Sequence, residues 1–363
     1  MLIYWIIFFV LFYLSFSKNN NRKTSFLIAA SILMFLGATR GSTVGNDMAG
    51  GYSLEYKYIH ANPSSWGQVM GRFEVGFAWL MGNFKDYVSE DRMLFFHLLF
   101  FVTFLLRLYP IKKYSENAAL SLFFMFGLGY YFSLYNTMRQ ELAFSIVGLF
   151  LPFILDRGRT WLKWYIIGVI ITSVLFHKGL LVMLVLPIIN YAKDKKWLSY
   201  KIEIFVVLSS FFIGMFGAKF LLSYLSNFAF LFADSNSNFG GYLQYGDLIG
   251  SYSNLSNFLQ SLFCVYILYL HRNKRSIFLQ TYVLGIVLLN MLTPISWIYQ
   301  RIAYIFMYFS IFVFTDLWQN ISDKKTRHQF QLAAILFTLI LFNNRLINDH
   351  NSDVVPYINY FLK

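Results

Sequence analysis

Five ionisable side chains lie beside long apolar runs and have the chemistry to bind phosphate and move a proton. Arg40, Arg139 and Arg301 each lie at one end of an apolar segment, Asp47 follows in TRGSTVGND, and His177 lies in LFHKGLL. Arginines present planar forks that suit phosphate oxygens, and several can clamp a diphosphate. A histidine takes up a proton near neutral pH. Together these residues indicate a site that stabilises a departing diphosphate and activates a hydroxyl group.

Each of these residues also has a plainer interpretation. A lone arginine at a span end can snorkel to lipid headgroups, and Asp47 can cap its own backbone in a glycine-rich turn. His177 with Lys178 can form a short polar turn between two spans. No Asp/Glu-rich metal motif is visible, so arginines would take the place of a divalent cation, and we expect no metal and no cofactor.

The composition places these residues in a membrane. The chain is 58% hydrophobic and 21% aromatic, and 13% of its residues are charged, against about 25% in an average globular protein. It predicts an all-α polytopic membrane protein, with residues 1–363 as a single multi-pass domain. The lone Cys264 excludes a disulfide framework. The run Leu2–Phe16 is interpreted as a retained first span rather than a signal peptide.

Hydropathy predicts about twelve transmembrane helices, with a range of 10–13. The predicted spans are 2–17, 24–38, 92–109, 117–134, 138–155, 162–176, 179–191, 201–222, 255–271, 277–292, 301–318 and 329–342.

Basic residues predict the orientation. Of the 30 Lys and Arg, 19 lie on six alternate short loops or span ends. These are Lys18, Arg22, Lys23, Arg107, Lys112, Lys113, Arg157, Arg159, Lys163, Lys193, Lys195, Lys196, Lys201, Arg272, Lys274, Arg275, Lys324, Lys325 and Arg327. The positive-inside rule then places these loops in the cytoplasm and both termini outside. The net charge of +13 is therefore a topology signal, and we expect no nucleic-acid partner.

This topology predicts external loops near 39–91 and 223–254, and an external tail from Asn343 to Lys363. Segment 66–82 contains Arg72 and Glu74, so it is predicted to be an interfacial or re-entrant helix rather than a crossing. All five candidate residues then fall on the outer side, although none was used to choose the orientation. Burying charge at a membrane face costs several kcal/mol, so such residues usually have a function.

Five motifs, in order along nearly the whole chain, resemble those of one family. RGSTVGNDMAGGY, YNTMRQELAFSI, LFHKGLLVML, YQRIAYIF and VVPYINYF are similar to the signature segments of the EpsG family, the Wzy-like polysaccharide polymerases. The residues at the motif positions are Arg40, Asp47, Arg139, Gln140, His177 and Arg301.

The resemblance implies a multi-pass enzyme of the bacterial cytoplasmic (inner) membrane, active at its periplasmic or extracellular face. Such an enzyme would polymerise oligosaccharide repeat units carried on undecaprenyl diphosphate into O-antigen, capsule or exopolysaccharide. The growing chain on its lipid would be the donor, and a new lipid-linked unit the acceptor. A chain-length regulator protein is the expected partner, together with the lipid bilayer.

On this interpretation Arg139, Arg301 and Arg40 would hold the donor diphosphate. His177 would be the base for the acceptor hydroxyl or the residue that orients it, with Asp47 as the second candidate for that role.

The neighbouring residues receive lesser roles. Gln140 would help to orient the donor. Glu141 stands where the family usually has a small residue, and would pair with Arg139 or offer another base. Lys178 would add a phosphate contact. Tyr52 would stack on a sugar ring or belong to the interfacial aromatic belt, as would Tyr56, Trp66, Tyr242, Tyr245 and Tyr252.

Other functions remain open at this point. An O-antigen ligase or another lipid-linked-donor glycosyltransferase would use a similar outer face but usually carries a larger external domain. A flippase for the same lipid-linked units should show repeats and broken helices near mid-membrane. A membrane O-acyltransferase would use a histidine but would have no clear use for several arginines.

Overall fold

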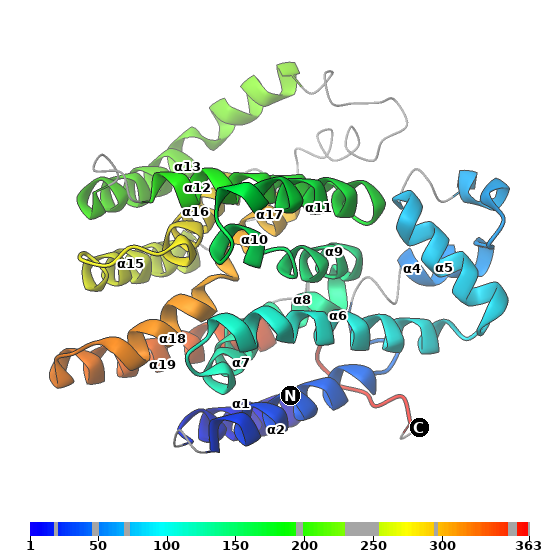
Figure 1. The fold of residues 1–363 in the computed structure, drawn as a ribbon, viewed down its shortest axis with the longest axis horizontal. Helices are drawn as coiled ribbons and strands as arrows, with labels where there is room; N and C mark the ends of the chain where they lie inside the picture. The colour runs from blue at the N-terminus through cyan, green and yellow to red at the C-terminus, as the bar shows by residue number, and fades with distance from the viewer. Residues whose placement is uncertain are drawn as a thin grey trace. The chain divides into compact units, whose positions relative to one another are not determined.

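The computed structural model describes residues 1–17, 21–45, 51–68, 73–193, 199–228, 254–293, 297–347 and 354–361. Their regular structure is helical, apart from one isolated antiparallel bridge between Arg40 and Asn359. The chain divides into unit 1, residues 1–181 with 311–363, and unit 2, residues 182–310, each of which can be followed by colour in Figure 1. The predicted all-α fold is confirmed for these residues.

Five helical segments of the described chain are long and apolar enough to cross a membrane, and a bent helix pair makes a sixth. The five are 92–114, 138–155, 200–217, 300–320 and 324–347, and the bent pair covers 118–136. Each overlaps a predicted span. The chain is therefore a multi-pass membrane protein.

The count of twelve spans is not confirmed. Five further predicted spans correspond to apolar helices of 10–17 residues, at 2–15, 162–175, 178–192, 255–270 and 277–292, and span 24–38 corresponds to a helix of 17 residues. At 1.5 Å per residue, a 14-residue helix is roughly 21 Å long, shorter than the ~30 Å hydrocarbon core. Segment 179–191 also begins as a 3₁₀ helix, Lys178–Val185, rather than as an α-helix.

Unit 1 contains most of the predicted site. Its elements are α1 (Leu2–Ser15), α2 (Arg22–Ala38), α4 (Gly51–Tyr58), η2 (Pro63–Gln68), α5 (Val75–Tyr87), α6 (Arg92–Tyr114), α7 (Ala118–Gly127), α8 (Tyr130–Asn136), α9 (Met138–Gly148), α10 (Pro152–Leu155), η3 (Arg159–Trp161), α11 (Leu162–Leu175), the start of η4 (Lys178–Val185), α18 (Ser310–Asn320) and α19 (Lys324–Ile347). Helices α1, α2 and α7 pack together, and α6 packs against both α2 and α9.

The predicted span 117–134 is broken in the structure. Helices α7 and α8 meet at an angle of 62°. Gly129 between them has φ +85°, in the left-handed region that a residue with a Cβ rarely adopts. Helix α8 then ends at Thr137, where α9 begins, and α9 packs beside α6.

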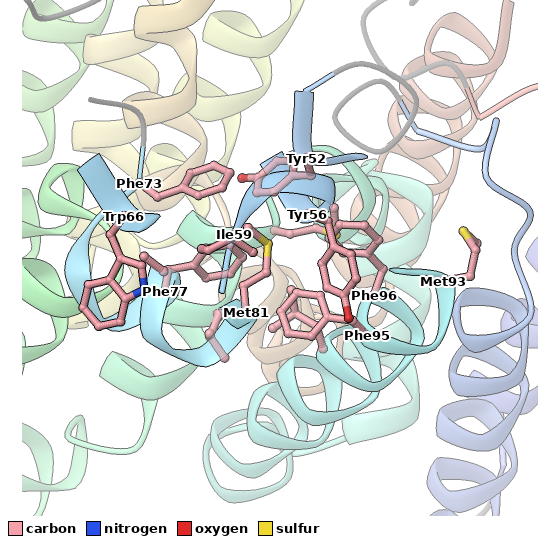
Figure 2. Packing of buried hydrophobic residues seen from close by; sticks show 14 residues of the cluster. Tyr52, Tyr56, Ile59, Trp66, Phe73, Phe77, Met81, Met93, Phe95 and Phe96 are labelled. Atoms are coloured by element: carbon pink, nitrogen blue, oxygen red, sulfur yellow. The ribbon is translucent and has the colours of Figure 1, made fainter. Parts of the chain in front are cut away.

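Residues 51–68 and 73–87 form a small folded block on the N-terminal half of α6, which we call the α4–α5 block. Figure 2 shows its aromatic core, in which Tyr52, Tyr56 and Phe77 pack around Phe95 and Phe96 of α6. The predicted helix 66–82 is thus divided between η2 and α5, and residues 69–72 lie outside the described part of the chain.

Unit 2 contains α12 (Leu186–Ala192), α13 (Tyr200–Phe228), α15 (Asn254–Leu270), α16 (Ile277–Leu292) and α17 (Trp297–Met307). Inside it, Asn290 of α16 bonds to Ser210 of α13 at 3.0 Å and to Ser261 of α15 at 2.9 Å. Polar side chains that bond across apolar helices hold their packing in register. Most of the predicted external loop 223–254, from 229 to 253, lies outside the described residues.

Candidate functional site

Arg139 lies in the first turn of α9, which runs parallel to α6. Along the two helices Arg107 contacts Glu141 and Ser145, and Pro110 contacts Gly148. This register places Arg139 level with about residues 101–105 of α6, roughly 15 Å or more from the start of that helix. Arg139 therefore lies beside the middle of α6, with the α4–α5 block packed above Met138 and Leu142.

Glu74, immediately before α5, is a charged partner of Arg139. Its Oε2 accepts a hydrogen bond from Nη1 of Arg139 at 2.6 Å, and its Oε1 accepts one from the backbone N–H of Lys178 at 3.1 Å. The side chains of Arg139 and Glu74 are 17% and 11% exposed, so the pair is partly shielded but not sealed. One carboxylate thus joins the start of α9 to the chain that follows α11.

His177 faces the same carboxylate. Its Nδ1 lies 3.6 Å from Oε1 of Glu74, longer than a hydrogen bond, and its side chain is 27% exposed. Burial raises the pKa of the Glu74 carboxyl, but His177 and Arg139 outweigh burial and hold that pKa below its ordinary value. Glu74 is therefore ionised at neutral pH.

A close helix contact sets the position of Glu74. A Cβ at Gly76 would lie 2.7 Å from the carbonyl oxygen of Leu175, a distance that real Cβ atoms essentially never show. The absence of a side chain lets the start of α5 touch the end of α11. Because Glu74 lies two residues before this contact and His177 two residues after it, the contact brings the two side chains together.

Aromatic rings form one wall of the site. The hydroxyl of Tyr52 accepts a hydrogen bond from Nε of Arg139 at 3.1 Å, and the guanidinium lies 4.8 Å from the Phe73 ring centroid. Tyr52 stacks on Phe73 and is 4% exposed. The predicted stacking of Tyr52 on a sugar is therefore wrong, because its ring is already covered. Tyr56 and Trp66 are buried in the same core.

Arg40 is buried beneath α8 and α9. Its side chain is 0% exposed, its guanidinium lies 4.3 Å from the Tyr135 ring centroid, and Nη2 donates to the sulfur of Met138 at 3.4 Å. Its carbonyl oxygen bonds to Nε2 of His97 at 2.8 Å. Arg40 thus contacts Met138, the residue before Arg139, and its own side chain is not accessible to solvent.

The C-terminal VVPYINYF motif covers the backbone around Arg40. Gly41 N–H donates to the carbonyl of Ile358 at 2.6 Å, and Tyr360 N–H donates to the carbonyl of Thr39 at 2.8 Å. These bonds join the first and last motifs, whose bonded residues are 317 and 321 positions apart in the sequence.

Glu141 does not pair with Arg139. Its Oε2 accepts a hydrogen bond from Nη2 of Arg107 at 2.6 Å, and Nε of Arg107 donates to Ser145 at 3.0 Å. Arg107, which was predicted to lie at a cytoplasmic span end, is buried in the structure, and its side of the membrane stays a prediction. Its side chain is 4% exposed, inside α6, because Glu141 and Ser145 on the adjacent helix α9 satisfy its charge.

The remaining predicted residues are placed as follows. Gln140 is buried in α9, and the Lys178 side chain is exposed. Arg301 is half-buried in α17 and belongs to unit 2. Asp47, Tyr242, Tyr245 and Tyr252 lie outside the described residues.

Sequence reasoning missed the role of Glu74. From the sequence, Glu74 is interpreted only as a charge that opposes a membrane crossing, although a single carboxylate in the stretch FEVGFAWLMG is itself an anomaly. Across the described part of the chain, no three His, Cys, Asp or Glu side chains converge as they would around a metal ion. The cluster instead contains a cation that can contact phosphate, an imidazole that can act as a general base, and a carboxylate between them.

These features define a multi-pass helical membrane protein with a partly enclosed Arg–Glu–His cluster. The EpsG family model matches residues 23–359, so this chain belongs to the EpsG family, a family of Wzy-like polysaccharide polymerases. Searches of curated proteins and of solved structures gave no match.

Proposed function

We propose that this protein joins undecaprenyl-diphosphate-linked oligosaccharide repeat units into O-antigen, capsule or exopolysaccharide. The observation that carries the proposal is the cluster of Arg139, Glu74 and His177 in a member of a polymerase family. It combines a group that binds a diphosphate with a group that accepts a proton, the two functions that such a transfer needs.

In the proposed reaction, the acceptor hydroxyl oxygen attacks the anomeric carbon of the lipid-linked donor. The bond from that carbon to the diphosphate oxygen breaks, and its electron pair leaves with the diphosphate. His177 takes the hydroxyl proton, and Arg139 stabilises the negative charge that develops on the leaving group. Arg40 is closed to solvent, so it contributes positive charge from beneath, and Arg301 is a further candidate for the diphosphate.

The proposal includes the membrane arrangement. Twelve spans would place the α4–α5 block and the reaction at the outer face of the bacterial cytoplasmic membrane, with a chain-length regulator as a partner in the same membrane. The orientation can be tested by labelling introduced cysteines, because the single native cysteine, Cys264, is buried and should not react with the reagent. Cysteine introduced at exposed Tyr58 should react with a membrane-impermeant maleimide in intact cells, and cysteine at Lys113 should react only after lysis. The reverse pattern would overturn the orientation.

The function is tested in a strain that lacks this protein. Wild type, Arg139→Ala or His177→Ala is restored at matched expression, and surface glycan is separated on a gel. We expect long chains only with wild type, and glycan of one repeat unit with either variant. Arg92→Ala and His328→Ala remove an exposed arginine and an exposed histidine that are not members of the cluster, and should leave chain length unchanged.

The other outcomes discriminate among the alternatives. Long chains in the deletion strain itself would overturn the polymerase function. Long chains that stay on the lipid carrier would favour a ligase. Loss of all surface glycan, without single repeat units, would favour a flippase.

A further inference from the structure

The arginine proposed to bind the donor is already paired. Nη1 of Arg139 donates to Glu74 at 2.6 Å, so a diphosphate that approaches this guanidinium has to compete with a carboxylate. The diphosphate carries two negative charges spread over several oxygens, so it matches the arginine fork at least as well as one carboxylate oxygen does. The pair is also 11–17% exposed, so an incoming anion can reach it.

The imidazole beside the pair is incompletely satisfied. Within the described residues, Nδ1 of His177 is shielded from solvent and makes no hydrogen bond, although it faces Oε1 of Glu74 at 3.6 Å. A histidine that acts as a base through Nε2 needs a proton on Nδ1, and an acceptor at that nitrogen orients the ring and stabilises the imidazolium that forms. Glu74 is the nearest acceptor, but its Oε2 is committed to Arg139.

We propose that Glu74 is an exchangeable counter-ion: the donor diphosphate takes Arg139 from Glu74, and the released carboxylate moves onto Nδ1 of His177. This inference rests on the proposed function and deepens it, because it couples donor binding to the readiness of the base. Glu74 is then a positioning residue, since it acts through His177 and does not touch the sugar.

The exchange keeps the Glu74 carboxylate hydrogen-bonded at every stage. Before donor binding, Glu74 neutralises Arg139; afterwards the diphosphate does so. When His177 takes the acceptor proton, Glu74 faces an imidazolium instead of a guanidinium. Between these two stages the carboxylate is held by hydrogen bonds from Nδ1–H of the neutral His177 and from the backbone N–H of Lys178, which lower the cost of a partly buried charge. The backbone N–H of Lys178, 3.1 Å from Oε1, keeps the carboxylate near His177 throughout.

The test compares binding with turnover in purified protein reconstituted in nanodiscs. The binding probe is farnesyl diphosphate, and farnesol serves as the probe without phosphate. The variants are Glu74→Gln, Glu74→Asp and Arg139→Ala. Glu90→Gln is the matched control, because it removes one negative charge at an exposed position.

We expect Glu74→Gln to bind farnesyl diphosphate about tenfold more tightly than wild type, because Arg139 loses its competitor. The same variant should polymerise about 100-fold more slowly, because His177 loses its acceptor. Arg139→Ala should bind the probe at least about tenfold more weakly. Glu74→Asp should retain more turnover than Glu74→Gln, and Glu90→Gln and farnesol should show no change.

A merely structural Glu74 would hold Arg139 in place, so its loss would weaken binding. Equal or weaker binding of the probe by Glu74→Gln therefore overturns the exchange, as does failure of wild type to bind the probe. Unchanged turnover in Glu74→Gln overturns its role toward His177. Tighter binding by Glu74→Gln in a protein whose wild type forms no polymer would support the exchange at Arg139 and reject the polymerase function.

Discussion

Two arginine–glutamate pairs involve the first turns of α9, and they differ in how they are enclosed. Nη2 of Arg107 and Oε2 of Glu141 lie 2.6 Å apart, and the two side chains are 4% and 8% exposed. Ser145 accepts a further hydrogen bond from Nε of Arg107. Arg139 and Glu74 also lie at 2.6 Å, but they are 17% and 11% exposed and share the carboxylate with Lys178 N–H and His177. The same type of ion pair joins two helices in a buried position at Arg107–Glu141, and at Arg139–Glu74 it remains accessible to solvent.

The difference follows from where the partners come from. Glu141 and Arg107 belong to two long packed helices, so neither can move without disturbing the register of α6 and α9. Glu74 lies on the short segment before α5 and has no helical hydrogen bond to hold its side chain. The two pairs therefore have the same chemistry and differ in their exposure and in the elements that carry them.

The largest expected effect is on stability, at the enclosed pair. Glu141→Ala leaves Arg107 as a buried charge without its carboxylate, and should lower the free energy of unfolding by about 3–5 kcal/mol. The double variant Arg107→Met/Glu141→Met should recover most of that loss, because it removes both charges. Thermal or denaturant unfolding in detergent measures both; a loss below about 1 kcal/mol in the single variant would contradict the structural role.

The equivalent change at the open pair should separate stability from activity. Glu74→Ala should cost only about 1 kcal/mol, because Arg139 can reach water, whereas polymer synthesis should fall about 100-fold. The same unfolding assay and the glycan gel give the two values. A destabilisation as large as that of Glu141→Ala would show that the two pairs are equivalent.

A smaller effect is expected at Gly179. A Cβ there would lie 2.9 Å from Nε2 of His177, and the imidazole can relieve the clash only by rotating. Gly179→Ala should therefore reduce polymer synthesis about tenfold with little loss of stability. Gly217→Ala is the control, because its Cβ would make an ordinary contact of 3.7 Å with Ile213. Wild-type chain length in Gly179→Ala would mean that the orientation of this ring is not critical.

The smallest effect concerns acid. The pKa of Glu74 in the folded protein lies below its ordinary value of 4.5. This group therefore adds stability above pH 4.5 that is lost as the pH falls through its folded pKa. Wild type should lose more stability than Glu74→Gln on acidification below that value. Parallel unfolding curves of the two proteins, followed downward from pH 6, would contradict the sign.

Much of the fold was predictable from the sequence because lipid imposes a simple rule. Apolar runs such as 92–109 and 138–155 coincide with observed helices of spanning length. The break at Gly129 was not predicted, because hydropathy is insensitive to a change in helix direction. The burial of Arg107 was missed because a positive charge near a span end is normally a topology signal.

The candidate site was only partly predictable. Arg139 and His177 were recognised from residue types and motif order, and the structure brings both side chains to one carboxylate, which also accepts a hydrogen bond from the backbone N–H of Lys178. Their partner Glu74 could not be identified, because it lies 65 residues from Arg139 in the chain. Glu141 was the nearer carboxylate in sequence, but its side chain is directed to Arg107.

By itself, the sequence determined the all-helical membrane class, the EpsG membership and the arginine and histidine that carry the proposed chemistry. Those properties reside in composition and in short local motifs. Only the tertiary structure decided which carboxylate faces which cation, that Tyr52 is part of a core, and that Arg40 lies beneath the site. Such pairings depend on close contacts like that of Gly76 with Leu175, which join segments about 100 residues apart and leave no periodic signal in either one.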